Sequence, residues 1–143
     1  MNKYIKKIII SIILMNIILV LSACFSLTAR EKEYYYDEDN FITATGTVIH
    51  IKYNDSRTEL YLGLSELNPK FDDVNFEIVG KNLPIVQENG IDEKIQLGDQ
   101  VEFITAPKYF GDGYVMPIVS ISVDGEELLS YEEGYANFLE WLD

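Results

Sequence analysis

The chain of 143 residues contains a single cysteine and a single histidine, and both limit the chemistry that it can perform. Cys24 follows Leu21, Ser22 and Ala23, which themselves end a long apolar run. A lone cysteine cannot form an intramolecular disulfide, and a free thiol is a liability in an oxidising compartment. A thioether bond between this sulfur and a lipid would remove the liability.

The first 23 residues have the pattern of a secretory signal peptide. Three lysines precede the apolar run 8–21, and the small residues Ser22 and Ala23 follow it. A membrane-spanning helix needs about 20 apolar residues, whereas this run is shorter and is interrupted by Asn16. We therefore expect the segment to be cleaved rather than retained as a span.

The stretch Leu21-Ser22-Ala23-Cys24 resembles the lipobox of bacterial lipoproteins, and the resemblance covers the first 24 residues. It implies that the Cys24 thiol receives a diacylglycerol and that cleavage falls between Ala23 and Cys24. Two acyl chains hold a protein stably at a membrane, whereas one chain binds only marginally. The resemblance thus implies a protein anchored in membrane lipid through Cys24, on the outer face of the bacterial cell membrane.

The remaining residues contain no recognisable catalytic motif. His50 has no cysteine nucleophile to activate if lipid consumes Cys24, and neither G-x-S-x-G nor S-x-x-K occurs. Zinc would need several Cys or His ligands, and the acidic clusters Asp37–Asn40 and Asp72–Asp73 do not match an EF-hand loop. We expect a surface histidine, no catalytic residue, no metal and no cofactor. Paired carboxylates, as in glycoside hydrolases, remain an alternative because acids are abundant.

Aromatic side chains around a turn are the strongest binding signal. The stretch KYFGDGYVM, residues 108–116, places Tyr109, Phe110 and Tyr114 around a Gly-Asp-Gly turn that does not need them. Tyr61 and Arg57 are candidates for the same ligand site. Tyrosine combines flat apolar area with a polar tip, which suits sugars and peptides. The alternative is that these rings fold down and cap the core.

Charge narrows the choice of partner. The formal net charge is −13, and loss of residues 1–23 would leave eight basic residues against 24 acidic ones, a net charge of −16. Nucleic-acid binding depends on Lys and Arg neutralising phosphates, so we expect no nucleic-acid partner. We expect instead a protein, peptide or glycan partner.

Alternating apolar and polar residues predict that half-buried strands position these side chains. The alternation occurs around residues 47–53, 58–64, 74–79, 100–104 and 115–123. Residues 83–89 predict a short helix that ends at Gly90. Ser130 to Glu133 has capping-box spacing, and apolar residues at helical intervals behind it predict a C-terminal amphipathic helix.

Three strands, a short helix and two further strands form an order that resembles the oligonucleotide/oligosaccharide-binding (OB) fold, a five-stranded Greek-key barrel. A mainly β fold with a small OB-like barrel is therefore expected, and a β-sandwich is the alternative. In the OB-fold, the loops holding Arg57 and Tyr109 to Tyr114 would flank the ligand face.

The predicted organisation is a signal peptide over residues 1–23, a lipidated tether over 24–40 and one β-rich domain over 41–143. Tyr34 to Tyr36 could be part of a solvated linker, a motif for a partner, or a segment packed on the domain. The expected function is a non-enzymatic binding module. Alternatives are an immunity or inhibitor lipoprotein against a cationic toxin, an envelope hydrolase with paired carboxylates, and a structural role in an envelope complex.

Overall fold

The computed structural model describes residue 13 and residues 32–71, 74–109 and 114–143. The chain divides into two compact units, Met1–Tyr34 and Tyr35–Asp143, and everything below concerns the second unit. Its strands are β1 (Ile42–Tyr53), β2 (Glu59–Asn68), β3 (Asn75–Val79), β4 (Gln100–Thr105), β5 (Met116–Val123) and β6 (Glu126–Leu129). Its helices are η1 (Glu38–Asn40), α2 (Asn82–Glu88), α3 (Ile91–Lys94) and α4 (Tyr131–Leu142).

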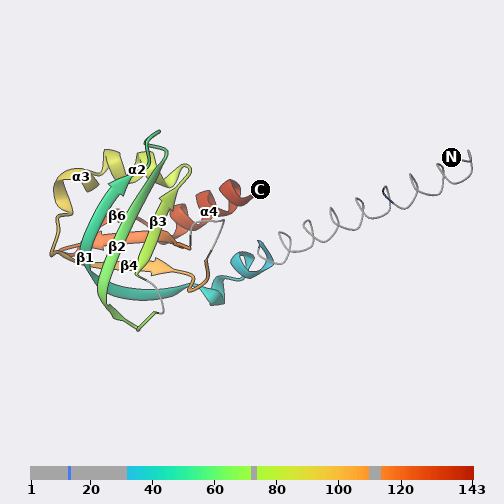
Figure 1. The fold of residues 1–143 in the computed structure, drawn as a ribbon, viewed down its shortest axis with the longest axis horizontal. Coiled ribbons are helices and arrows are strands. Elements are labelled where there is room, and N and C mark those ends of the chain that lie inside the picture. Colours follow the sequence, from blue (N-terminus) through green and yellow to red (C-terminus); the bar gives the residue numbers. More distant parts are fainter. Residues whose placement is uncertain (1–12, 14–31, 72–73, 110–113) are drawn as a thin grey trace, which may run out of the picture. The chain divides into compact units, whose positions relative to one another are not determined.

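The strands form a mainly β, OB-like barrel, as the sequence predicts (Figure 1). The sheet order is β3-β2-β1-β4-β5-β6, and all of these neighbours are antiparallel. A parallel pairing of β3 with β5, in the register Phe76↔Met116, closes five of the strands into a ring. This closed ring excludes the β-sandwich alternative, and β6 extends it beside β5.

Period-two burial in β2 explains how this strand faces the core. Leu60, Leu62 and Leu64 have at most 1% exposed surface, whereas Glu59 and Tyr61 on the opposite face are half-buried. Alternate side chains of a strand point to opposite faces, so this alternation directs the leucines into the barrel. Phe76 and Phe103 meet there edge to face, with 4.8 Å between ring centroids.

In β1, a bulge reverses the predicted alternation. The sequence pattern suggests a common face for Ile49, Ile51 and Tyr53, but Ile49 is 51% exposed and Val48 is buried instead. The pairing with β2 slips between Val48 and His50, so one additional residue is inserted in β1. Such a residue moves every later side chain to the other face. The prediction was wrong for Ile49 for this reason.

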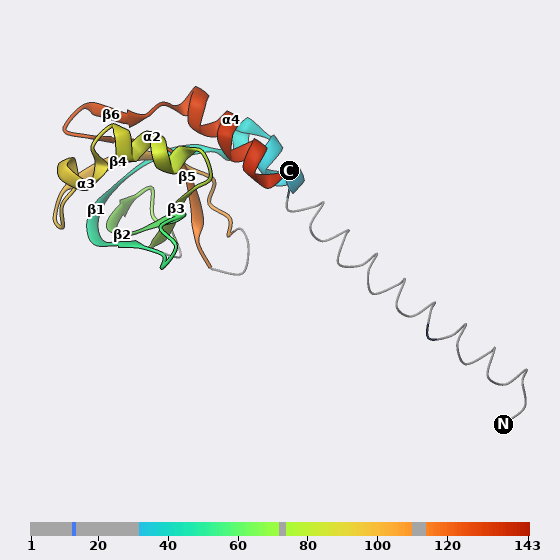
Figure 2. The same cartoon turned by 90° about the horizontal axis from the view of Figure 1, so that it is seen from above.

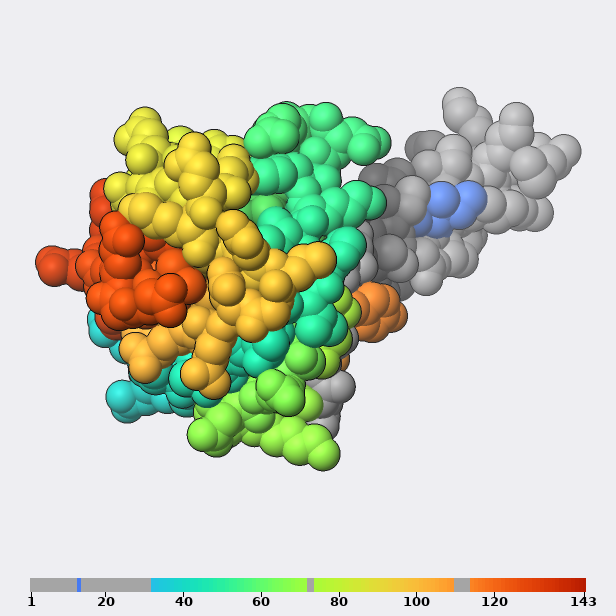
Figure 3. Space-filling view, turned by 90° about the vertical axis from the view of Figure 1, so that its left-hand side faces the viewer, coloured from blue at the N-terminus to red at the C-terminus, as the bar shows by residue number. Residues whose placement is uncertain are grey.

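The predicted helix between β3 and β4 is confirmed. It is α2, which begins at Asn82 rather than Leu83 and buries Leu83 and Val86. Gly90 follows with φ +83°, a left-handed conformation that ends α2 and begins α3. Figure 3 shows the side of the domain where α3 lies beside the β5–β6 hairpin. An ion pair between Lys94 of α3 and Glu126 of β6 joins the two.

Helix α4 packs on the outer face of the barrel, against β5. Gly134 approaches the strand so closely that an added Cβ would lie 1.9 Å from the Val119 carbonyl oxygen. The predicted C-terminal helix is therefore confirmed, and one face of it is core. The predicted capping box does not form, because the Ser130 side chain makes no capping hydrogen bond although the residue occupies the N-cap position.

Tyr35 packs on the domain, although the sequence pattern predicts a tether over residues 24–40. Tyr35 is 1% exposed and contacts Phe138 of α4 edge to face, with centroids 5.4 Å apart. The Tyr35 hydroxyl donates to the Lys108 carbonyl, and the Tyr135 hydroxyl donates to the Tyr35 carbonyl. Figure 2 shows residues 35–40 alongside α4. Of the three readings of Tyr34 to Tyr36, packing on the domain holds for Tyr35.

Candidate functional site

Tyr109 and Tyr114 form an exposed aromatic pair at the loop between β4 and β5. Their rings meet edge to face, with centroids 5.9 Å apart and planes at 72°. Tyr114 is 74% exposed and Tyr109 is 38% exposed, so these two rings do not fold down as a cap on the core. Phe110, predicted to join them, lies outside the described residues.

The backbone of Tyr114 lies in the left-handed region, with φ +49°. This region costs an L-residue with a bulky side chain about 1–2 kcal/mol, and glycine normally occupies it. Strain of this kind concentrates at binding and catalytic sites. An aromatic residue that is both strained and exposed therefore marks the β4–β5 loop as a candidate for ligand contact.

Tyr61 lies in a cross-strand row that runs over three neighbouring strands, β2, β3 and β5. It pairs with Glu77 of β3, which in turn pairs with Pro117 of β5. The Tyr61 hydroxyl donates to Glu59 Oε2 over 2.9 Å. Burial raises the pKa of Tyr61 to about 12, with a smaller contribution from this hydrogen bond, so its hydroxyl stays protonated at neutral pH.

Glu77 is the unexpected member of this row. The alternation in residues 74–79 predicts an outward, solvated carboxylate, but Glu77 is only 5% exposed. Desolvation, with a smaller contribution from the negative charge of Glu59, raises its pKa to about 7. Within the cluster of Tyr61, Glu59 and Glu77, the Glu77 carboxyl can therefore exchange a proton near neutral pH.

Arg57 lies at the opposite end of β3 from the tyrosine pair. It precedes β2, whose first residue Glu59 pairs with Val79 at the end of β3, whereas Tyr114 precedes β5, which starts beside Phe76. The Arg57 guanidinium sits 4.1 Å from the centre of the Tyr53 ring. Arg57 and the tyrosine pair therefore flank the outer face of β2 and β3 without forming one compact site.

The loop that carries Arg57 is held by Asn54. The Asn54 side-chain oxygen accepts hydrogen bonds from the backbone N–H groups of Thr58, over 2.8 Å, and Glu59. Its amide nitrogen donates to Glu59 Oε2 over 2.9 Å. Asparagine commonly stabilises turns through such bonds to nearby backbone groups. These bonds fix the conformation of the loop that borders the neighbouring surface.

A groove that the sequence analysis missed lies beside this loop. It has a volume of about 490 Å³ and is formed by the β1–β2 loop, α2 and Trp141 of α4. Trp141 is 44% exposed and lies over Gly80, where an added Cβ would be 2.8 Å from its Cδ1 atom. The helical spacing of the last residues did not single out Trp141, because only the packing of α4 brings it beside the loop.

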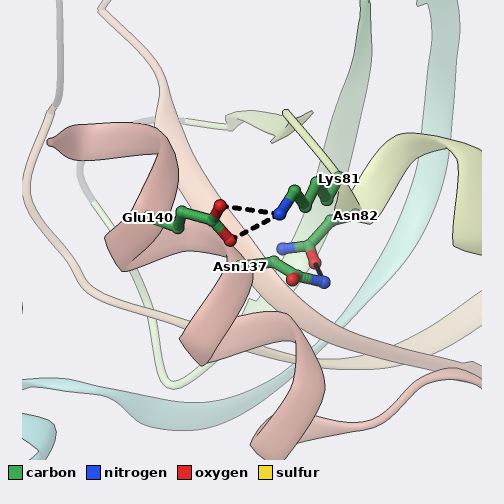
Figure 4. Close-up of polar contacts among 4 residues, drawn as sticks. All are labelled: Lys81, Asn82, Asn137 and Glu140. Carbon is green, nitrogen blue, oxygen red and sulfur yellow. Dashed lines mark hydrogen bonds and ion pairs between the residues drawn. The ribbon is translucent and has the colours of Figure 1, made fainter.

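A polar network fixes α4, and therefore Trp141, against the start of α2 (Figure 4). Lys81 Nζ lies 2.6 and 2.7 Å from the two carboxylate oxygens of Glu140. Asn137 Nδ2 donates to Asn82 Oδ1 over 3.1 Å. Asn82 Nδ2 in turn donates to the Gly134 carbonyl over 2.8 Å. These bonds hold α4, the helix that carries Trp141, against the start of α2.

The remaining predicted site residues that the structure describes do not lie at the tyrosine pair, the Tyr61 row or the groove. Leu21, Ser22, Ala23 and Cys24 lie outside the described residues, as does the acidic cluster Asp72–Asp73. His50 is an exposed residue of β1, as predicted. Among the described residues, no three His, Cys, Asp or Glu side chains are grouped so that they could hold a metal ion. In the same part of the chain, no helix has the length and apolarity needed to cross a membrane.

No protein-family model matches the chain, and no curated protein shows significant similarity to it.

Proposed function

We propose that this protein is a lipid-anchored, extracytoplasmic binding module that holds a protein or peptide partner on the outer face of β2 and β3. The exposed, strained Tyr114 and its edge-to-face contact with Tyr109 carry this proposal. Tyrosine is enriched among the residues that contribute most to protein–protein binding. An exposed ring on a strained backbone adds nothing to the core, so contact with a ligand best explains why a tyrosine stands at position 114.

The partner is proposed to be cationic where it contacts the domain. Glu59 lies on the outer face of β2, where it accepts a hydrogen bond from Tyr61, and the formal net charge of the chain is −13. Opposite charges steer association and suppress wrong partners. A cationic toxin or peptide, intercepted by an immunity or inhibitor protein, is the narrower form of the same proposal.

The anchor is proposed from the lipobox-like stretch that ends at Cys24. Attachment at Cys24 would place the binding domain beyond the membrane surface, connected through residues 25–34. The Cys24→Ala variant tests this part by itself. We expect the variant to lose incorporation of labelled palmitate and to leave the membrane fraction, whereas retention of both label and location would contradict the anchor.

Crosslinking of the anchored protein on intact bacterial cells, with mass spectrometric identification of the captured molecule, tests the binding function. We expect a specific partner that is lost in the Tyr109→Ala/Tyr114→Ala double variant. Leu97→Ala is the matched control, because Leu97 is also exposed, at 68%, but lies in the turn before β4. Capture that survives the double variant would refute the aromatic pair as the site.

The pair Glu59 and Glu77 favours a hydrolase as a second candidate. A carboxyl with a pKa of about 7 can act as a general acid while a nearby carboxylate acts as the base. However, the burial that raises the pKa of Glu77 also keeps its carboxyl from contact with substrate. Binding is therefore the better supported function. Release of sugar fragments from cell-wall glycan by the wild type, but not by Glu77→Gln, would reverse this order.

A further inference from the structure

We propose that the groove beside Trp141 is a second binding site and that it accepts a neutral saccharide of one or two rings. This site goes beyond the proposed partner-binding face. It lies at the end of β3 where Val79 leads into Gly80, whereas the tyrosine pair lies at the start of that strand.

The indole of Trp141 is held in place as a platform. Gly80, with φ +59°, lets Trp141 lie directly on the backbone, because any side chain there would collide with the ring. Phe138 stacks nearly parallel to Trp141, with centroids 6.2 Å apart and planes at 15°. A rigid aromatic surface loses little conformational entropy on binding. Trp141 nevertheless keeps 44% of its surface exposed, so part of this platform is available to a ligand.

Hydrogen-bonding groups surround the platform. Thr58 comes from the β1–β2 loop, Glu59 from the start of β2 and Gln87 from α2, and Leu83 and Pro84 supply apolar contact. A pyranose ring has apolar C–H groups on its faces and hydroxyl groups around its edge. The groove matches both features, with an indole and aliphatic side chains beside donors and acceptors. Its volume of about 490 Å³ falls within the range of small-ligand sites.

Charge favours a neutral sugar. Among the described residues that line the groove, Arg57 is the one cation and Glu59 the one anion. The Glu59 carboxylate already accepts hydrogen bonds from Tyr61 and Asn54. The net charge of −13 repels acidic saccharides. A groove with balanced charges in a strongly acidic protein therefore selects against uronic acids and other anionic sugars.

The walls of the groove disfavour an extended peptide. Peptides that lie along a protein by main-chain hydrogen bonds need an unpaired strand edge. The described residues that line this groove come from the β1–β2 loop, the start of β2, the turn after β3 and two helices. Beside the groove, β2 and β3 are paired with each other. The groove thus offers side-chain contacts rather than a strand edge.

The test is a glycan array probed with the full-length protein in micelles of a detergent that contains no sugar. We expect binding to neutral glycans, followed by a saturable change in tryptophan fluorescence when the same mono- or disaccharide is titrated. Trp141 is the single tryptophan of the chain, so this signal reports on the groove itself. An array without bound glycans would overturn the proposal.

Variants separate this site from the partner-binding face. We expect Gln87→Ala to weaken the fluorescence titration at least tenfold and Trp141→Ala to remove array binding, with Tyr114→Ala unchanged in both. Gln87 is half-buried at the surface of α2, so its truncation keeps the test valid if Trp141→Ala fails to fold. Unchanged sugar affinity in Gln87→Ala would overturn the site. Fluorescence that responds to a captured protein but to no glycan would also overturn it and identify a peptide groove.

Discussion

Asn82 Nδ2 donates a hydrogen bond to the backbone carbonyl of Gly134 over 2.8 Å, and Asn82 has no exposed surface. This bond joins residues separated by 52 positions, at the point where α2 meets α4. It contributes to holding Trp141 at the edge of the groove, because Trp141 lies two turns further along the same helix.

Loss of the Asn82 side chain should destabilise the domain. We expect Asn82→Ala to lower the free energy of unfolding by about 1–3 kcal/mol, since it removes a buried donor and acceptor together. Urea denaturation measures this change. Asn137→Ala is the comparison variant because it removes only the bond to Asn82 Oδ1 and leaves the bond to Gly134 in place, so it should cost about 1 kcal/mol, the lower end of that range. Equal losses of unfolding free energy in the two variants would mean that the bond to Gly134 contributes no additional stability.

Gly134→Ala separates helix propensity from packing. Propensity alone predicts that alanine in the middle of α4 stabilises the protein by about 1 kcal/mol. The new Cβ would lie 1.9 Å from the Val119 carbonyl oxygen, so α4 must move away from β5. We expect a net loss of about 1–3 kcal/mol in thermal or urea unfolding, typical of overpacking.

Ala136→Gly is the control for this prediction. Ala136 is an exposed residue of the same helix, so its replacement tests propensity without a packing change. We expect a loss of about 1 kcal/mol there. Stabilisation by Gly134→Ala would show that α4 is not pressed against β5 as described.

Glu77 should make stability depend on pH in a defined direction. Its pKa is raised from 4.5 to about 7 in the folded protein, so the folded state binds this proton more tightly than the unfolded state does. The free energy of unfolding therefore falls as pH rises from about 4.5 to 7. After allowance for solvent screening, we expect this contribution to be on the order of 1–2 kcal/mol.

Two variants isolate the Glu77 contribution. Glu77→Gln should flatten stability between pH 4.5 and pH 7, as measured by urea denaturation across that range. Glu59→Gln should remove a negative charge that raises the Glu77 pKa, and should thereby shift the fall in stability to lower pH. A Glu77→Gln profile that runs parallel to the wild type would contradict the raised pKa.

Tyr114→Gly should separate stability from binding. Glycine adopts φ +49° without steric cost, but it loses more backbone freedom on folding. We expect the free energy of unfolding to stay constant or to rise by up to about 1 kcal/mol, while partner capture is lost. A clear loss of stability instead would mean that the Tyr114 ring supports the fold, and capture by the variant would exclude it from the site.

Local sequence patterns determined the five strands of the barrel ring and two of the helices, α2 and α4. Leu60, Leu62 and Leu64 alternate with polar neighbours, and Gly90 ends a short apolar helix, so each feature depends on residues close in the chain. The order of these elements then limited the topology, and the ring closure through β3 and β5 agrees with it. The exposed pair Tyr109 and Tyr114 was also found from its turn.

Only the tertiary structure decided which outer surfaces are buried and which residues meet there. Tyr35 and Glu77 look solvated from their neighbours, but both are buried in the folded domain. Trp141 becomes part of a groove because α4 lies across β5 and places the indole on Gly80. Burial of an outer face depends on a segment distant in the chain, and neither residue periodicity nor local propensity contains that information.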